Sequence, residues 1–256
     1  ILDRPNPLGG VKVAGSIAEP GRESFVLPDS IPMVHGLTLA ELAQFFARDL
    51  RIELEYFKLK NWSRSTIWSD HDFPWIWPSP NLPTIETVYA YPGTVLLEAT
   101  NLSEGRGTCL PFLAVGAPWI ASPDRFVKKV VSLLRGKTQG FQLQPFQFKP
   151  TFNKYQNQIC YGFQIHVTDA KIFSPYELGL ATIAAASQMY EKYFAFKQPP
   201  YEYEYERNPF EVILGQKNAV EKILDRKFNI DEEFWSSGSK EYKTNIKKFY
   251  LYPEDE

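Results

Sequence analysis

Eleven residues near the middle of the chain hold most of the side chains with the potential for chemistry. Residues 98–108 contain two carboxylates, Glu98 and Glu104, and place Arg106 between two glycines. Two carboxylates beside one bond are what glycoside hydrolysis requires, because one protonates the leaving oxygen and the other acts as base or nucleophile. An arginine between glycines suits bidentate contact with a carboxylate or phosphate. The stretch predicts a site for a polar, partly anionic ligand, with both glutamates as catalytic candidates and Arg106 as a binding residue.

Structural interpretations of the same residues stand beside the functional ones. Glu98 and Arg106 would also fit an ion pair that only stabilises the loop, and Glu104 would also fit a solvent-exposed loop position. Glu98 is the first choice for a functional role, because a carboxylate at the end of a buried element must be paired, hydrogen-bonded or shifted in pKa.

The remaining chemistry-bearing residues are sparse. His35 lies in a loop before a helix and His166 on the polar face of a strand, so either would suit binding of an acid group or proton transfer, although a lone strand histidine is more often structural. No histidines have metal-ligand spacing, so no metal site is expected. Cys109 and Cys160 are read as two buried free thiols. The Gly-x-Gly around Arg106 lacks the rest of a dinucleotide fingerprint, and no cofactor is expected.

These residues need elements that hold them in place. Residues 94–97 form a short apolar run after Pro92-Gly93, which predicts a turn leading into a strand buried on both faces, as in a parallel sheet. Ligands of open α/β sheets bind past the carboxyl ends of such strands, where Glu98 would lie. Residues 53–59 and 201–206 also favour strands. Residues 141–148 and 159–168 alternate apolar and polar side chains, which is typical of half-buried antiparallel strands.

Helix signals complete the predicted layout. Capping boxes begin helices at Thr38 and at Ser174, the second of which extends towards Phe196, and Ser122-Pro123 begins a third. The fold class is therefore α/β, with a parallel-sheet part over residues 1–112 and an α+β part over residues 113–256.

Composition limits the class of function. The chain has 256 residues, 44% of them hydrophobic, and a formal net charge of −2, which favours neither nucleic acid nor an anionic membrane as a partner. No apolar run approaches the roughly 20 residues that span a bilayer. The chain begins Ile1-Leu2 without a methionine or leader, and we expect an N-terminal segment that is not represented.

Eight longer motifs occur in one order along the chain: residues 3–7 (DRPNP), 31–38 (IPMVHGLT), 78–84 (PSPNLPT), 91–93 (YPG), 98–108 (EATNLSEGRGT), 116–119 (GAPW), 150–152 (PTF) and 166–169 (HVTD). Together they resemble the NamZ/YbbC-type exo-β-N-acetylmuramidases, bacterial glycoside hydrolases that act on peptidoglycan fragments. The resemblance covers most of the chain and weakens after about residue 210. It implies a Rossmann-like lobe, a C-terminal α+β lobe, and an active-site cleft between them.

The resemblance also implies an activity and a setting. It implies release of a terminal β-linked N-acetylmuramic acid from the non-reducing end, in an extracellular or periplasmic compartment, with muramic-acid saccharides as the binding partners. Family members are longer at the N-terminus and carry there a Pro-Glu-His-Gly motif, whose glutamate is a candidate catalytic carboxylate that this chain lacks.

Substrate contacts follow from the same resemblance. Arg106 or His166 suits the lactyl carboxylate and the tryptophan-rich residues 61–83 suit the sugar ring, and the implied substrate-binding residues are Arg106, Asn101, His35, His166, Ser103 and Asn81. Two other functions remain open: a non-catalytic peptidoglycan-sugar binding protein, and a hydrolase of the amide or lactyl ether of the same substrate. Stereochemistry, preferred aglycone and oligomeric state are also open.

Overall fold

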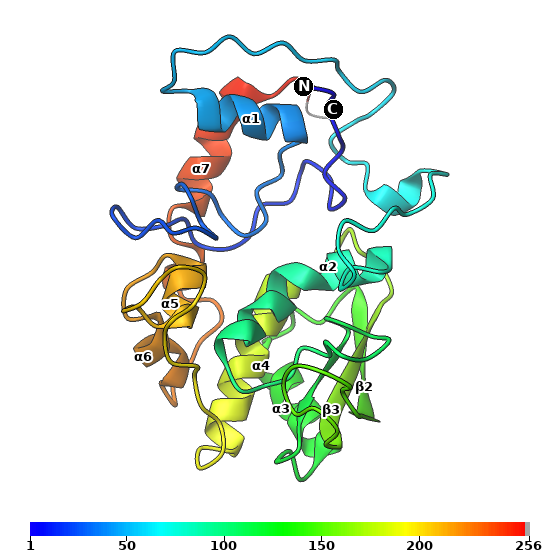
Figure 1. Cartoon of the computed structure of the whole chain (residues 1–256), viewed down its shortest axis with the longest axis vertical. Coiled ribbons are helices and arrows are strands. Elements are labelled where there is room, and N and C mark those ends of the chain that lie inside the picture. Colours follow the sequence, from blue (N-terminus) through cyan, green and yellow to red (C-terminus); the bar gives the residue numbers. More distant parts are fainter. Residues whose placement is uncertain (254–256) are drawn as a thin grey trace.

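The computed structural model describes residues 1–253 and shows a mixed α/β chain with several helices and one small sheet (Figure 1). Its α-helices are α1 (Leu39–Ala47), α2 (Ile85–Thr94), α3 (Pro123–Leu133), α4 (Pro175–Met189), α5 (Pro209–Leu214), α6 (Ala219–Leu224) and α7 (Ser239–Asn245). Single turns of 3-10 helix are η1 (Trp68–Asp70), η2 (Val95–Ala99), η3 (Glu233–Ser236) and η4 (Ile246–Phe249).

The sheet is antiparallel throughout. It contains β1 (Ala114–Ala117), β2 (Phe141–Phe148) and β3 (Cys160–Val167), in the order β1-β3-β2. Phe141 pairs with Val167 and Phe148 with Cys160, so β2 and β3 match along their whole length. The two alternating segments at 141–148 and 159–168 are thus confirmed as antiparallel strands.

Three helices bury the core beside this sheet. Helix α3 packs against β2 and β3, and α4 packs against both α2 and α3 (Figure 1). Almost all of α4 is excluded from solvent, from Leu178 to Ser187. A helix that is apolar on every side must lie inside the core. Helix α3 begins with Pro123 at its first turn, as the sequence predicts.

The predicted buried strand at residues 94–97 is wrong. Helix α2 runs through Pro92-Gly93 to Thr94, and Val95–Ala99 then forms η2. A short apolar run does not distinguish a buried strand from a buried helical turn, because both are enclosed on all sides and both favour apolar residues throughout. The sequence of Pro92-Gly93 suggested a turn, but glycine is needed here for close helix packing.

That close packing is a contact between two glycines. A Cβ built on Gly93 would lie 1.7 Å from the carbonyl oxygen of Pro175, and one built on Gly179 would lie 2.2 Å from the carbonyl oxygen of Gly93. Helices α2 and α4 therefore cross with their backbones in contact. Because η2 follows α2 directly, this crossing sets the position of η2 and of Glu98 within it.

The predicted parallel-sheet lobe is not seen within residues 1–112. In the described part of that range the only parallel pairing is an isolated bridge between Leu2 and Phe57, so the predicted strand at 53–59 is reduced to this bridge. Residues 201–206 likewise form a tight turn with one bridge, between Tyr201 and Glu204.

The capping box at Thr38 is confirmed. Ser174 makes no capping bond through its side chain, and α4 ends at Met189 rather than near Phe196. The boundary near residue 112 stays a prediction.

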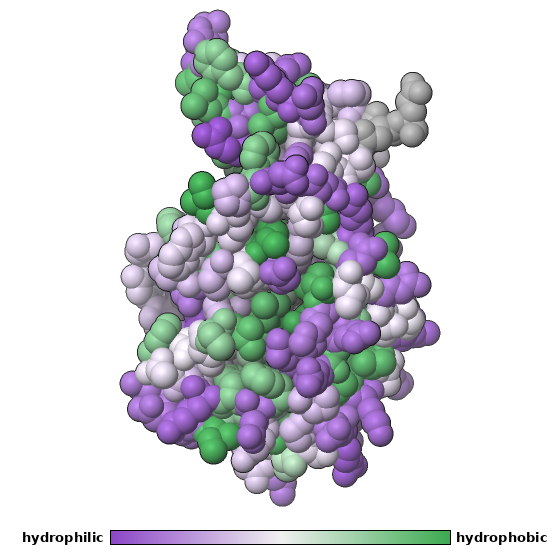
Figure 2. All heavy atoms as spheres, turned by 90° about the vertical axis from the view of Figure 1, so that its right-hand side faces the viewer, coloured by the Kyte–Doolittle hydropathy of each residue, from purple (hydrophilic) through white to green (hydrophobic). Residues whose placement is uncertain are grey.

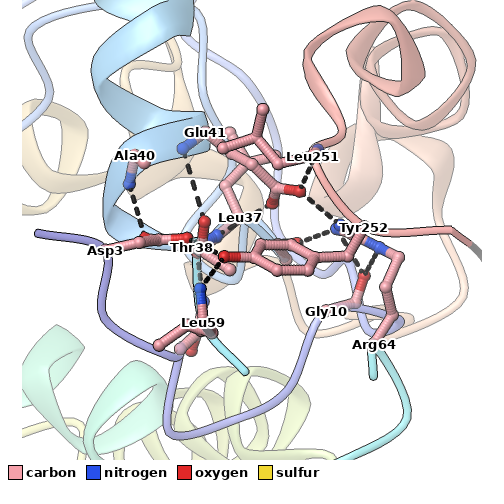
Figure 3. Close-up of polar contacts among 12 residues, drawn as sticks. Asp3, Gly10, Leu37, Thr38, Ala40, Glu41, Leu59, Arg64, Leu251 and Tyr252 are labelled. Atoms are coloured by element: carbon pink, nitrogen blue, oxygen red, sulfur yellow. Dashed lines mark hydrogen bonds and ion pairs between the residues drawn. The ribbon is translucent and has the colours of Figure 1, made fainter. Parts of the chain in front are cut away.

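The N-terminal segment, α1 and the last residues of the described chain come together above this core. The N-terminus and the last described residues lie there (Figure 1). In a side view this part stands as a narrower mass on a broader body, with polar and apolar residues mixed over the visible face (Figure 2). A buried polar network joins these segments (Figure 3). In it Asp3 accepts from Ala40 N and from the Tyr252 hydroxyl, and Glu41 pairs with Arg64 at 2.8 Å.

No helix within residues 1–253 is long and apolar enough to cross a membrane. Cys109 and Cys160 are both free thiols, as predicted, although Cys109 is exposed rather than buried.

Candidate active site

A cavity of about 440 Å³ lies between the N-terminal segment and the helical body. One wall comes from residues 16–35, a second from the end of α2 and the following loop, and a third from residues 176–214. Its polar lining residues are Ser16, His35, Tyr91, Glu98, Arg106, Tyr176, Tyr201 and Glu202. Three of the predicted site residues, Glu98, Arg106 and His35, are therefore brought together around one space.

The loop that carries Arg106 depends on its two glycines. Gly105 and Gly107 adopt φ of +79° and +84°, a region that side chains strongly disfavour. A Cβ on Gly107 would also lie 2.5 Å from the carbonyl oxygen of Phe152. Thr108 adds a hydrogen bond from its hydroxyl to Gly105 O at 2.6 Å. The glycines let the chain fold tightly enough for Arg106 to turn back towards Glu98.

Glu98 and Arg106 form a direct ion pair at the cavity wall. Nη2 of Arg106 donates to Oε1 of Glu98, and the Tyr201 hydroxyl donates to Oε2 at 3.1 Å. The Glu98 side chain retains 13% exposure and Arg106 retains 29%, so both still face the cavity. Burial raises the pKa of Glu98, against the opposing effect of Arg106. Burial thus favours the protonated form of Glu98 more than it would for an exposed glutamate, while Arg106 favours the ionised form.

Tyr201 reaches Glu98 from a tight turn more than a hundred residues along the chain. The backbones of Tyr201 and Glu204 exchange hydrogen bonds of 2.8 and 2.9 Å. The Glu204 carboxylate closes the turn by accepting from the backbone N–H groups of residues 205–207 and from Nε of Arg207. These donors lower the pKa of Glu204 to about 2. The turn is therefore held by a permanently charged carboxylate, which keeps the Tyr201 hydroxyl directed at the site.

Glu104 lies behind the cavity wall rather than in it. Its side chain is 2% exposed, so the solvent-exposed interpretation of Glu104 is wrong. Nζ of Lys154 donates to Oε2 of Glu104 at 2.8 Å and to the carbonyls of Leu97 and Leu102 at 2.8 and 2.7 Å. Burial lowers the pKa of Lys154 to about 8. Oε1 of Glu104 lies 3.7 Å from Nε of Arg106, so Glu104 helps to orient the arginine, and a direct catalytic role for it stays a prediction.

His35 also lines the cavity, from the N-terminal segment. Leu37 N donates to its Nδ1 at 3.1 Å, which assigns the ring proton of the neutral form to Nε2. Burial lowers the pKa of His35 to about 4. At neutral pH His35 is therefore an uncharged hydrogen-bond donor, not a cationic partner for an acid.

The other predicted binding residues lie away from the cavity. Asn101 bridges to the next segment, donating to Tyr193 O at 2.7 Å and accepting from Ala195 N at 3.1 Å. Ser103 is buried and accepts from Gly105 N at 3.2 Å. His166 pairs with Gln144 on the sheet surface, and Asn81 is half-buried in its loop. None of the four lines the cavity, and their roles in substrate binding stay predictions.

Three residues of the site were missed by the sequence analysis. Tyr91, Tyr201 and Lys154 each contact or border the Glu98 loop. Tyr91 belongs to the YPG motif at residues 91–93 but was given no role of its own, and Tyr201 and Lys154 have no local motif. Only the nearby Pro150-Thr151-Phe152 motif gave a signal for Lys154. The tryptophans of residues 61–83 do not line the cavity.

This arrangement suits acid chemistry on a polar ligand. The cavity is lined by one carboxyl group with a raised pKa, one arginine, one neutral histidine and three tyrosines. Within residues 1–253 no three His, Cys, Asp or Glu side chains are grouped to hold a metal ion.

Two family models match the chain in succession. The model described as exo-beta-N-acetylmuramidase NamZ, N-terminal, matches residues 1–86, and the model described as exo-beta-N-acetylmuramidase NamZ, C-terminal, matches residues 89–252. A Bacillus subtilis protein named peptidoglycan beta-N-acetylmuramidase NamZ is 40% identical over 198 residues, which cover 77% of this chain and 47% of that protein.

Two solved structures are similar to this chain. A crystal structure of a DUF1343 family protein from Bacteroides fragilis superposes with a TM-score of 0.85 at 26% identity, covering 98% of this chain and 65% of that one. A second such protein from the same organism gives a TM-score of 0.71 at 27% identity, covering 100% of this chain and 67% of that one. The chain thus spans about half the length of the curated relative it matches.

Proposed function

Because the chain belongs to the exo-β-N-acetylmuramidase NamZ family, we propose that it forms the muramic-acid site of a glycosidase acting on peptidoglycan fragments. The Glu98–Arg106 pair at the cavity wall carries the proposal. It puts a carboxyl group with a raised pKa beside a cation, and the sugar to be released carries both a glycosidic oxygen and a lactyl carboxylate. The bond cleaved would be the terminal β-linkage at the non-reducing end.

Roles follow from the geometry of the lining residues. Glu98 serves as the general acid that protonates the leaving oxygen, since its pKa is raised and its side chain reaches the cavity. Arg106 binds the lactyl carboxylate, and neutral His35 donates to a sugar oxygen. The second carboxylate that glycoside hydrolysis needs is Glu104 or the glutamate of the Pro-Glu-His-Gly motif that the family resemblance implies. The Rossmann-like lobe and an extracellular or periplasmic location belong to the same proposal.

The test compares two chromogenic substrates that differ only in the lactyl group. A β-N-acetylmuramide and the matching glucosaminide are offered to this chain, to Glu98→Gln, and to the Bacillus subtilis relative as a positive control. We expect hydrolysis of the muramide alone, with a loss of about 10³-fold or more in Glu98→Gln. Glu86→Gln removes an exposed carboxylate of α2 and should keep full activity. A Glu98→Gln rate equal to that of the unsubstituted chain would reject the assignment.

Binding of the sugar without turnover is the second candidate function. It is favoured by one observation, that Glu104 is committed to Lys154 and does not line the cavity. A chain that binds N-acetylmuramic acid but cleaves neither substrate, beside an active relative, would support it.

A further inference from the structure

Arg106 is a shared cation. Among the cavity-lining residues in the described chain it is the only Lys or Arg, while Glu98 and Glu202 are the lining carboxylates. Its guanidinium is already paired with Glu98, and its Nε lies 3.7 Å from Glu104. Nε is buried and has no hydrogen-bond partner. An anionic ligand that needs Arg106 must therefore compete with Glu98 for it.

The four ion-paired groups at Arg106 are balanced in charge before any ligand arrives. Glu98 and Glu104 carry two negative charges, and Arg106 and Lys154 carry two positive ones. All four side chains are at least 70% withdrawn from solvent, with exposures of 13%, 2%, 29% and 11%. Adding a carboxylate to this group leaves one uncompensated negative charge where water screens poorly, which is costly. Uptake of one proton restores the balance.

We propose that the carboxylate of a muramic-acid sugar displaces Glu98 from Arg106, and that Glu98 then binds one proton taken from solvent. The inference rests on the proposed function and deepens it. Carboxylate replaces carboxylate on the guanidinium, so one ion pair breaks as another forms. The proton adds to the freed carboxylate of Glu98, which becomes the carboxylic acid that protonation of a leaving oxygen requires.

Glu98 is the group placed to take this proton. Arg106 and Glu104 face it from its own loop, Lys154 from behind, Tyr91 from α2, and Tyr201 with Glu202 from the turn. Glu104 keeps its partner Lys154 when the ligand binds. Tyr91 and Tyr201 have raised pKa values and already hold their protons. Of the other lining groups, His35, whose pKa is lowered to about 4, and Glu202 could also bind a proton, and loss of proton uptake in Glu98→Gln separates both of them from Glu98.

In this proposal the lactyl carboxylate contributes to catalysis as well as to binding, because it displaces Glu98 from Arg106 and so allows Glu98 to be protonated. A sugar without the carboxylate leaves Glu98 ionised on Arg106, and the site then lacks its acid. Selectivity for muramic acid over glucosamine should therefore appear in kcat as well as in KM, because the interaction changes the reacting state.

Calorimetry in two buffers of different ionisation enthalpy, phosphate and Tris at pH 7, measures the proton directly. The probes are N-acetylmuramic acid and N-acetylglucosamine, titrated into the chain, Glu98→Gln and His35→Gln. We expect the unsubstituted chain to take up nearly one proton per bound N-acetylmuramic acid and none with N-acetylglucosamine. Glu98→Gln should take up none, and His35→Gln should take up the same number per bound N-acetylmuramic acid as the unsubstituted chain. Glu98→Gln should also bind muramic acid about tenfold more tightly, because Arg106 is then free of a competing charge.

Three other calorimetric results would each overturn the proposed displacement of Glu98. Muramic acid binding without proton uptake overturns the exchange and leaves the proposed function standing. Uptake that persists in Glu98→Gln also overturns it. Absence of muramic acid binding to the unsubstituted chain overturns both the exchange and the proposed site.

Discussion

Lys154 and Glu104 form a buried ion pair directly behind the cavity, with 2.8 Å between Nζ and Oε2. All three protons of the ammonium group are used, since Nζ also donates to the carbonyls of Leu97 and Leu102. These carbonyls lie on either side of Glu98 in the chain. The pair therefore fixes the segment that presents Glu98, although neither side chain lines the cavity.

Replacement of this lysine should be strongly destabilising. Lys154→Met leaves Glu104 buried without its cation, and loss of one partner of a buried pair costs about 3–5 kcal/mol. Urea unfolding of the variant measures the free energy of unfolding. Lys149→Met, at an exposed position just after β2, is the matched control and should change it by less than about 0.5 kcal/mol. The double variant Lys154→Met/Glu104→Gln should recover much of the loss, and equal stability of the two single lysine variants would contradict the assignment.

The neutral state of His35 predicts a loss of stability in acid. Folding lowers the pKa of His35 from 6.5 to about 4, so the unfolded chain binds its proton more readily. The resulting stability is present in full above pH 6.5 and is lost as pH falls through about 4, and it amounts to at most about 3 kcal/mol. His35→Gln should flatten the pH dependence of Tm between these values. His166→Gln is the control: it keeps His35, so its Tm should still fall in acid. If the Tm of His35→Gln falls with pH as steeply as that of the unsubstituted chain, another group is responsible.

The glycine contact between α2 and α4 predicts a steric effect without backbone strain. Gly179 has an ordinary helical backbone, but its added Cβ would lie 2.2 Å from Gly93 O, so Gly179→Ala must push the helices apart. We expect a loss of about 3 kcal/mol, at the upper end for overpacking. Gly136→Ala is the contrast, because φ there is +91° and nothing lies within 4 Å of the new Cβ. It should cost about 1 kcal/mol from the left-handed backbone alone. Both variants are compared by thermal unfolding, and a Gly179→Ala protein as stable as the parent would refute the close crossing.

Local patterns in the sequence predicted local structure well. The alternation at 141–148 and 159–168 gave the β2–β3 pair, and Ser122-Pro123 marked the start of α3, because both signals arise within one element. Glu98 and Arg106, eight residues apart, were predicted as a possible pair and are one. Residues 94–97 failed because burial on all sides erases the periodicity that separates strand from helix.

Contacts over long chain distances were beyond these patterns. Tyr201 lies 103 residues from Glu98, and Lys154 lies 50 residues from Glu104. No sequence pattern at Tyr201 or Lys154 predicts which residue it contacts, because the burial of a lysine and the direction of a hydroxyl are set by the surrounding fold. The sequence analysis thus found the loop of the site and missed the side chains that hold it.

The buried network near the chain ends predicts coupling between stability and the cavity. Arg64 is 1% exposed, pairs with Glu41 at 2.8 Å and donates to the carbonyls of Gly10 and Gly36 (Figure 3). Gly36 follows His35 directly, so the same guanidinium supports the backbone of a cavity residue. Arg64→Met leaves Glu41 with only backbone donors and should cost about 3–5 kcal/mol.

Arg64→Lys tests whether charge alone is enough. A single ammonium group cannot reproduce the planar fork that reaches one carboxylate and two carbonyls, so Lys should recover only part of the loss. Exposed Arg51→Met is the control and should leave unfolding unchanged. Muramic acid affinity, measured where each variant is still folded, should fall in Arg64→Met and stay constant in Arg51→Met. A full rescue by lysine would show that the carbonyl contacts around Gly36 add nothing to the position of His35.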